Sequence, residues 1–197
     1  MTPIEIDKIV NPYSYIEYKE LVIKLAEEKK CTGEQSPEKV NATALNAQRM
    51  KRIDKQIELN DDLKNVISSI NKKYTWTLIV ESWCGDGAQC VPVIAKISEL
   101  NPNIELNLIL RDENPSYMDN FLTNGARAIP KLIFEYNNKV IGTWGPRPKA
   151  IQKMVTEYKQ NNPDVSHEDF VTILHLWYAR DKTQSLQNEL KTILSDF

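Results

Sequence analysis

The chain has few cysteines and no framework of paired ones: Cys31, Cys84 and Cys90 are the three in 197 residues. An odd number without regular spacing argues against a disulfide-stapled secreted scaffold and favours a reducing, cytoplasmic compartment. Histidine is scarcer still, and both His167 and His175 lie far along the chain from the cysteines. The sequence therefore contains no zinc-like cluster of ligands, and we expect no metal site.

The sequence also has neither a strong charge of one sign nor a long apolar run. Its formal net charge is −2, so the composition does not indicate nucleic acid or a membrane as a partner. The one locally basic stretch, RMKRIDK (49–55), is flanked by acids and is interpreted as a solvated helix face. No apolar run approaches the ~20 residues that a membrane helix needs. The N-terminal MTPIEIDKIV has no basic start, apolar segment or cleavage site, so we expect no signal peptide.

The sequence up to about residue 70 is expected to form helices. Ser14 and Glu17 have the spacing of a capping box at the start of the first helix. A loop is expected over 29–39, where Pro37 keeps the chain out of helix, and a second helix follows it. Asn60 can cap a third. The apolar faces of the second and third helices, which indicate core packing, carry Leu45, Met50, Ile53, Ile57, Leu63, Val66, Ile67 and Ile70.

The sequence pattern changes at Tyr74, where apolar segments rich in β-forming residues begin to alternate with helical segments. Asn137 and Asn138 indicate a hairpin turn, because asparagine tolerates left-handed geometry. The expected elements are a strand over 75–82, a helix over 87–100, a strand over 104–111, a short helix over 115–124, a hairpin over 131–144 and a helix over 148–160. This order predicts an α/β fold with a central mixed sheet and helices on both faces. After Pro163, a helix capped by Ser166 and a second helical segment complete the chain.

Cys84 lies where the strand over 75–82 ends and the next helix begins. Unpaired N–H groups and the positive end of the helix dipole favour a thiolate at such a position. Asp86, in the first turn, opposes this by like-charge repulsion, so the sign of the net pKa shift stays open. We expect the Cys84 thiol to be reachable by solvent, and the alternative is an inert buried cysteine.

Three motifs occur in order around this cysteine: WCGDGAQCVP (83–92), RDENP (111–115) and GARAIPKLIFEYNNKV (125–140). With them, the segment from Tyr74 to Gln160 resembles thioredoxin. The whole chain, including WGPRP (144–148), is similar to larger bacterial thioredoxin-family proteins of unassigned function. The resemblance implies a thioredoxin fold, a central mixed β-sheet flanked by helices, over 74–161. It leaves an N-terminal helical extension over 1–73 and a C-terminal helical extension over 162–197.

The resemblance also implies a site. Cys84 would be the catalytic thiol, and Pro130 would be the family's cis-proline, which turns the backbone of Ile129 toward an extended substrate chain. We further hypothesise that Arg147 offsets the charge of Asp86 and helps to hold a thiolate. The residues implied to line the substrate groove are Trp83, Gly85, Asp86, Gly87, Ile129, Pro130, Trp144, Gly145 and Arg147.

The sequence departs from the family pattern at the second cysteine, where Gly87 stands instead. Cys90 cannot simply replace it, because six helical residues rise ~9 Å and a disulfide needs Cα atoms within roughly 7 Å. Cys90 is therefore interpreted as a core cysteine. Leu78 stands where thioredoxin keeps a buried aspartate that assists the second cysteine. The absence of this aspartate is consistent with the absence of the second cysteine, because the acid would have no cysteine to assist. Cys31, in the 29–39 loop, is a conceivable internal resolving cysteine.

A single thiol cannot complete a two-cysteine cycle, but it can form a mixed disulfide that an outside thiol resolves. We therefore expect a monothiol thiol–disulfide oxidoreductase in cell redox homeostasis, acting on a protein disulfide or peptide. It would need no cofactor and would use glutathione or another small thiol as co-substrate. The alternative is a degenerate thioredoxin-fold module that binds a peptide or protein without turnover. Iron–sulfur binding, as in monothiol glutaredoxins, fits less well, since CGDG lacks their aromatic residue and serine.

Overall fold

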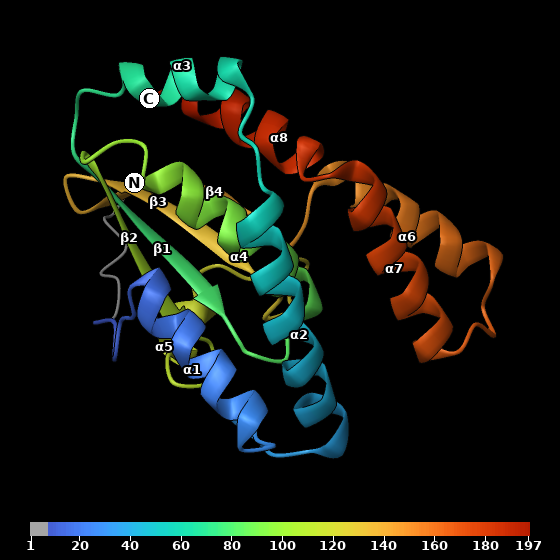
Figure 1. Cartoon of the computed structure of the whole chain (residues 1–197). Helices are drawn as coiled ribbons and strands as arrows, with labels where there is room; N and C mark the ends of the chain where they lie inside the picture. The colour runs from blue at the N-terminus through green and yellow to red at the C-terminus, as the bar shows by residue number, and fades with distance from the viewer. Residues whose placement is uncertain (1–7) are drawn as a thin grey trace.

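The computed structural model describes residues 8–197, and Figure 1 shows the chain. Residues 1–7, which include most of the stretch considered for a signal peptide, lie outside the described part. The elements are α1 (Tyr15–Glu27), α2 (Pro37–Gln56), α3 (Asp61–Ser69), β1 (Tyr74–Val80), α4 (Gly85–Ser98), β2 (Ile104–Leu110), α5 (Pro115–Asp119), β3 (Lys131–Tyr136), β4 (Lys139–Trp144), α6 (Lys149–Asn161), α7 (His167–Asp181) and α8 (Gln184–Leu194). None of the helices within 8–197 is long and apolar enough to cross a membrane.

The four strands form one mixed sheet in the order β2-β1-β3-β4. β1 pairs with β2 in parallel, whereas β1–β3 and β3–β4 are antiparallel. The sheet confirms the α/β fold that the order of elements predicted. The hairpin is confirmed as well, since Asn137 and Asn138 have φ values of 50° and 58° between β3 and β4.

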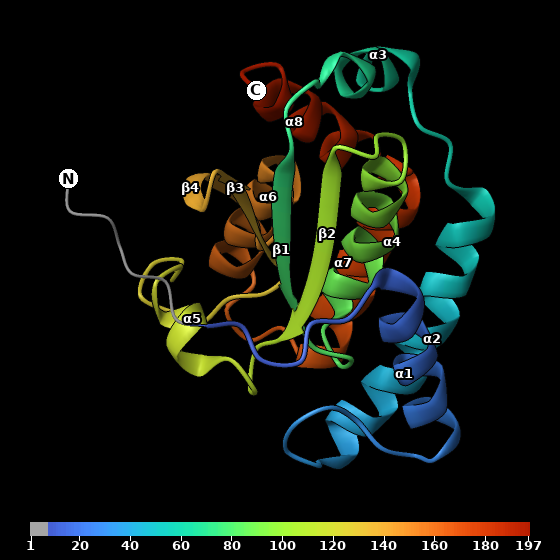
Figure 2. The same cartoon turned by 90° about the vertical axis from the view of Figure 1, so that its left-hand side faces the viewer.

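Alternating residues of the strands enter two cores of unequal size. Trp76, Leu78 and Val80 of β1 face a large core, whereas Ile79 faces a small one. The large core also takes residues of α4, α6 and the terminal helices, and the small core takes Tyr117 of α5. Figure 2 shows α5 on one side of the sheet and α4, with α1 and α2 beyond it, on the other. Because successive side chains of a strand point to opposite faces of the sheet, the buried strands contribute residues to both cores.

The N-terminal helices begin where their caps place them, with one correction. The capping box of α1 is confirmed, since the Glu17 carboxylate accepts from Ser14 N–H at 2.8 Å. Pro37, expected to prolong the loop, is instead the first residue of α2 behind the cap Ser36. Proline suits this position, because the N–H that it lacks would have no helical partner. Leu45, predicted on the apolar face, is 50% exposed.

The central helices are displaced slightly from their expected bounds. α4 begins at Gly85 rather than at 87, because Cys84 itself caps it. α5 ends at Asp119, well before the predicted 124.

The C-terminal segment closes the large core. Ser166 caps α7, as predicted. The side chain of Gln187, on α8, is fully buried and accepts from Asn60 N–H at 2.8 Å while donating to the Glu58 carbonyl at 3.0 Å. At the end of the chain, the ring of Phe197 stacks on Tyr74 with 4.9 Å between centroids. The segment is therefore part of the folded body.

Candidate functional site

Cys84 is the N-cap of α4, directly beyond the end of β1. Its sulfur accepts a hydrogen bond from Gly87 N–H at 3.3 Å, and its thiol donates to the Ile129 carbonyl at 3.4 Å. The Ile129–Pro130 peptide bond is cis, as the motif predicted. The turn at 84–87 and the cis-proline segment, which are distant in sequence, therefore meet at this sulfur.

The expectation of a solvent-reachable thiol was wrong, because Cys84 is only 8% exposed. It packs in the small core with Ile109, Ile129 and Trp83. Burial raises the pKa of Cys84 to about 12, and the charge of Asp86 adds to the increase. The Gly87 N–H group and the Arg147 guanidinium act in the opposite direction. The sequence left open whether the pKa of Cys84 is raised or lowered. Burial raises it, because it disfavours the charged thiolate.

Asp86 lies between two partners that the chain brings from its C-terminal part. The Arg147 guanidinium forms an ion pair with its Oδ2, and the Tyr178 hydroxyl donates to its Oδ1 at 2.7 Å. The predicted proximity of Arg147 and Asp86 is therefore present. Tyr178 was not foreseen, because 92 residues separate it from Asp86.

Gly145 also lies beside the cis-proline segment. A Cβ atom there would approach the Pro130 carbonyl oxygen to 2.3 Å, and φ is +113°. Both facts require glycine. Trp144, in contrast, was expected near Cys84 but faces the large core, because it pairs with Leu132 and points to the same side of the sheet. Its indole N–H donates to Glu189 of α8 at 2.8 Å.

Helix α7 lies against the first turns of α4. A Cβ atom at Gly85 would come within 2.9 Å of His175 Nε2, and Gln89 Nε2 is 3.0 Å from His175 Nδ1. The Tyr178 hydroxyl is 3.9 Å from the sulfur of Cys90. Burial, together with nearby arginines, lowers the pKa of His175 to about 4. The sequence predicted the helix that begins after Ser166, but it carried no signal for these polar contacts.

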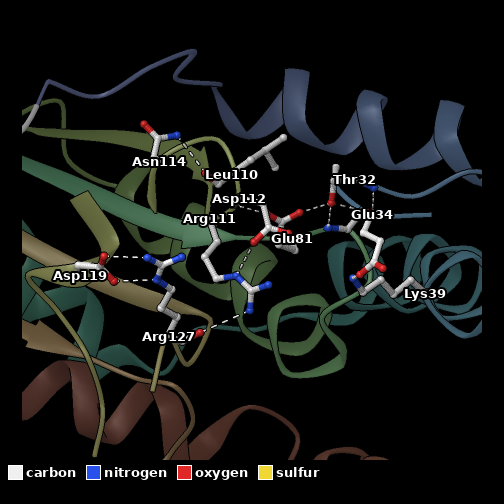
Figure 3. A network of polar contacts seen from close by, with 11 residues as sticks. Thr32, Glu34, Lys39, Glu81, Leu110, Arg111, Asp112, Asn114, Asp119 and Arg127 are labelled. Carbon is white, nitrogen blue, oxygen red and sulfur yellow. Dashed lines mark hydrogen bonds and ion pairs between the residues drawn. The ribbon is translucent and has the colours of Figure 1, made fainter. Parts of the chain in front are cut away.

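A buried polar network holds the other side of the turn, and Figure 3 shows the part formed by Thr32, Glu81 and Asp112. Glu81, 1% exposed, accepts from the Thr32 hydroxyl and from Asp112 N–H, the latter at 2.8 Å. Ser82 accepts from Thr32 N–H at 2.9 Å, and its carbonyl accepts from Asn46 of α2 at 2.8 Å. Burial raises the pKa of Glu81, and Asp112 adds to this effect. The N-terminal loop and α2 thus hold the two residues that precede Trp83 and Cys84.

Trp83, implied by the resemblance to line the substrate groove, is half-buried and has cationic neighbours. The Lys39 ammonium lies 5.1 Å and the Arg111 guanidinium 4.9 Å from its ring centroid. Each cation also has a carboxylate partner, Glu34 for Lys39 and Asp112 for Arg111, at 3.1 and 2.8 Å (Figure 3). The rim beside the thiol is therefore aromatic and lined with paired charges.

The remaining cysteines are free thiols and are buried. Cys90 is fully enclosed in the large core, as predicted. The loop of Cys31 does reach the end of β1 through Thr32, but the Cys31 thiol donates to the carbonyl of Glu34 in its own loop at 3.2 Å. Within 8–197, no group of three histidine, cysteine or acidic side chains is arranged to hold a metal ion.

Residues 33–159, more than half of the chain, match the family model described as Thioredoxin. Among solved structures, an HIV epitope scaffold is similar with a TM-score of 0.56 and 18% identity, covering 94% of this chain and 99% of that one. A protein of unknown function from Pseudomonas aeruginosa has a TM-score of 0.46 and 18% identity, covering 83% and 98%. A yeast mitochondrial 1-Cys peroxiredoxin has a TM-score of 0.34 and 19% identity, covering 51% and 92%. No curated protein matches the sequence.

Proposed function

Because the chain belongs to the thioredoxin family, whose members are thiol oxidoreductases at the coarsest level, we propose that it is a monothiol thiol–disulfide oxidoreductase that acts through Cys84. The position of its sulfur supports this proposal most directly. The sulfur lies at the start of α4, with Gly87 N–H donating to it, and faces the carbonyl that precedes the cis-proline. Gly87 occupies the place of a second cysteine, so an outside thiol has to complete the cycle.

The exchange would proceed in two balanced steps. In the first, the sulfur of Cys84 attacks a disulfide R–S–S–R′, a Cys84–S–S–R bond forms, and R′–S⁻ leaves with the proton that Cys84 gives up. In the second, a small thiol R″–SH attacks the mixed disulfide, R–S–S–R″ leaves, and the Cys84 thiol is restored. Glutathione or a similar small thiol would serve as R″–SH, and a protein or peptide disulfide as the substrate.

The proton of Cys84 is the main obstacle, since a pKa near 12 leaves little thiolate at neutral pH. The hydrogen bond from the thiol to the Ile129 carbonyl favours the protonated form. A substrate chain that pairs with this carbonyl through its own N–H would remove that bond. Binding of substrate at Ile129 would therefore favour ionisation of the thiol at the moment of attack.

The test is capture of the mixed disulfide. The reduced protein is treated with a peptide disulfide, quenched with acid and analysed by mass spectrometry. We expect an adduct at Cys84 that a small thiol removes, no adduct in Cys84→Ser, and normal adducts in Cys31→Ser and Cys90→Ser. Reaction at Cys84 without release by any small thiol would contradict turnover, and no reaction at all would contradict the proposal. Loss of turnover in Cys31→Ser alone would instead identify Cys31 as the resolving cysteine.

A second function, a binding module without turnover, is favoured by a different observation. Cys84 is 8% exposed and carries a raised pKa, as an unused thiol would. In that case a partner captured by the wild-type protein should bind Cys84→Ser with the same Kd. A large loss of affinity in this variant would count against a binding role independent of the thiol.

A further inference from the structure

The basic stretch 49–55 has charges that the rest of the molecule does not neutralise. Arg49 and Arg52 lie one turn apart on α2, half-buried and exposed respectively. None of the ion pairs within 8–197 includes either of them. Burial and the charge of Arg52 both lower the pKa of Arg49. These arginines thus repel each other instead of being balanced by a carboxylate.

Arg49 is linked to the turn that holds Cys84, and Arg52 follows it one helical turn later on α2. The guanidinium of Arg49 donates to the Asn46 side chain at 2.8 Å, and Asn46 donates to the Ser82 carbonyl at 2.8 Å. From the other side, the charges of Arg49 and Arg52 contribute to the low pKa of His175, whose ring lies against Gly85. Arg49 is therefore linked to the residue before Trp83 through Asn46, and both cations act on the histidine that lies against Gly85.

Space for a ligand adjoins Arg52. A cleft of about 440 Å³ between α2 and α7 is lined by Arg52, Glu58, Gln89, Tyr178 and Lys182, among others. Glu58 and Lys182 bring one charge of each sign, so Arg52 leaves the charge of the cleft positive. Near the thiol itself, Asp86 is already matched by Arg147 and by the Tyr178 hydroxyl.

We propose that Arg49 and Arg52 make the Cys84 site selective for anionic substrates, so that the thiol or disulfide exchanging with Cys84 carries carboxylates close to its sulfur. Such a substrate would be a small acidic thiol or an acidic peptide. The identity of the exchanging group rests on the proposed function. The charge preference itself is a property of the site that any sulfur-directed reagent can measure.

The first experiment compares two alkylating reagents that differ in charge. Wild-type protein is treated separately with iodoacetate, an anion, and iodoacetamide, a neutral reagent of similar size, and the Cys84 peptide is quantified by mass spectrometry. The ratio of the two rate constants is divided by the same ratio for a small neutral thiol. A change in the Cys84 pKa cancels in this ratio, because both reagents attack the same thiolate. We expect a normalised ratio above that of the free thiol, falling as added salt shortens the Debye length from roughly 10 Å at 0.1 M.

Substitutions then assign the effect. Arg49→Gln and Arg52→Gln should each lower the normalised ratio by about two- to fivefold, which is the effect of one charge acting through water over roughly 5–10 Å. Arg49→Lys and Arg52→Lys keep the charge and should retain the ratio. Lys139→Gln, at the hairpin start of β4 and at the end of the sheet away from Pro130, removes one cation remote from the site and should leave the ratio unchanged. Arg52 is exposed, so its variants keep the test valid should an Arg49 variant fold poorly.

The second experiment uses three matched disulfides: dithiodipropionate (anionic), hydroxyethyl disulfide (neutral) and cystamine (cationic). With rates normalised to the free thiol, we expect that order of decreasing reactivity at Cys84. A normalised alkylation ratio equal to the free thiol, or one that neither glutamine variant changes, would overturn the charge preference even if all three disulfides react. An elevated ratio that both glutamine variants reduce, with no disulfide reacting, would uphold the preference and refute the proposed oxidoreductase function.

Discussion

At the scale of single residues, the ionisation of Cys84 is governed by burial and by two opposite charges, Asp86 and Arg147. Asp86 raises the pKa of the thiol and Arg147 lowers it. Asp86→Asn should therefore lower the Cys84 pKa by about one unit, a modest effect for a like-charge neighbour, whereas Arg147→Ala should raise it. The measurement is the pH dependence of Cys84 alkylation, with Asp119→Asn as an exposed control. An unchanged pKa in Arg147→Ala would refute the role assigned to this arginine.

Glu81 provides a second prediction at this scale, since its pKa in the folded protein is raised above the ordinary 4.5 by burial. An acid with a raised folded-state pKa favours the native state below its unfolded pKa, and this contribution is lost as pH rises through the folded value. The wild type should therefore lose stability relative to Glu81→Gln as pH rises above about 4.5. Urea unfolding of both proteins across this range measures the difference.

Glu38→Gln is the matched control, because hydrogen bonds at the start of α2 lower the pKa of Glu38. The sign is then reversed, and the wild type should gain stability relative to this variant as pH rises. If the stability difference between wild type and variant changed in the same direction with pH for Glu81→Gln and for Glu38→Gln, burial of Glu81 would not set its pKa.

At the scale of elements, α7 covers the first turns of α4 through polar contacts of His175 and Tyr178. Each hydrogen bond of this kind contributes about 1 kcal/mol, so removing one should increase the open population by about fivefold. Tyr178→Phe and His175→Ala should therefore accelerate alkylation of Cys84, because lost burial lowers its pKa. Hydrogen exchange in α7 should rise in parallel. Thr172→Ala, on the exposed side of α7, is the control, and equal alkylation rates in all four proteins would show that α7 does not limit access.

The junction between α7 and α8 has an unusual backbone conformation. Lys182 and Thr183 both have positive φ, 50° and 68°. Left-handed conformations are unfavourable for such residues, and for a β-branched one above all. α8 is anchored beyond this junction by the Gln187 side chain, which bonds to the segment before α3, whereas His175 and Tyr178 of α7 bond to side chains of α4. The two terminal helices are therefore held to different parts of the molecule.

At the scale of the whole molecule, one large core joins all three proposed segments of the chain. It contains Met50 from 1–73, Trp76 from 74–161 and Leu190 from 162–197. We therefore predict a single unfolding transition, with calorimetry and tryptophan fluorescence giving the same Tm. Separate transitions would show that the extensions fold independently.

The substitution Gln187→Leu tests whether α8 unfolds together with the rest of the molecule. It leaves Asn60 N–H and the Glu58 carbonyl without their partner, which should cost about 1–3 kcal/mol. The midpoint should fall while the transition stays single. Gln184→Leu, at the exposed start of α8, should have little effect. A second transition in Gln187→Leu would indicate that α8 can detach by itself.

The sequence alone determined those features that depend on local pattern and short motifs. The mixed sheet followed from the order of the predicted strands and helices, and the cis-proline was implied by the resemblance to thioredoxin. The hairpin at Asn137 and the caps Ser14 and Ser166 were foreseen, since each depends on residues that are close in the chain. Cys84 at the start of a helix belongs to the same class.

The tertiary structure alone decided what surrounds the thiol. Tyr178 and His175, which contact Asp86 and Gly85, come from α7, some 90 residues away, and Glu81 is held by a loop from the other end of the chain. Trp144 turned out to face the large core, because its neighbour across the sheet, rather than its motif, sets its direction. Burial and charge at a site sum over everything that packs there, so the protonation state of Cys84 could be decided only once distant segments were placed together.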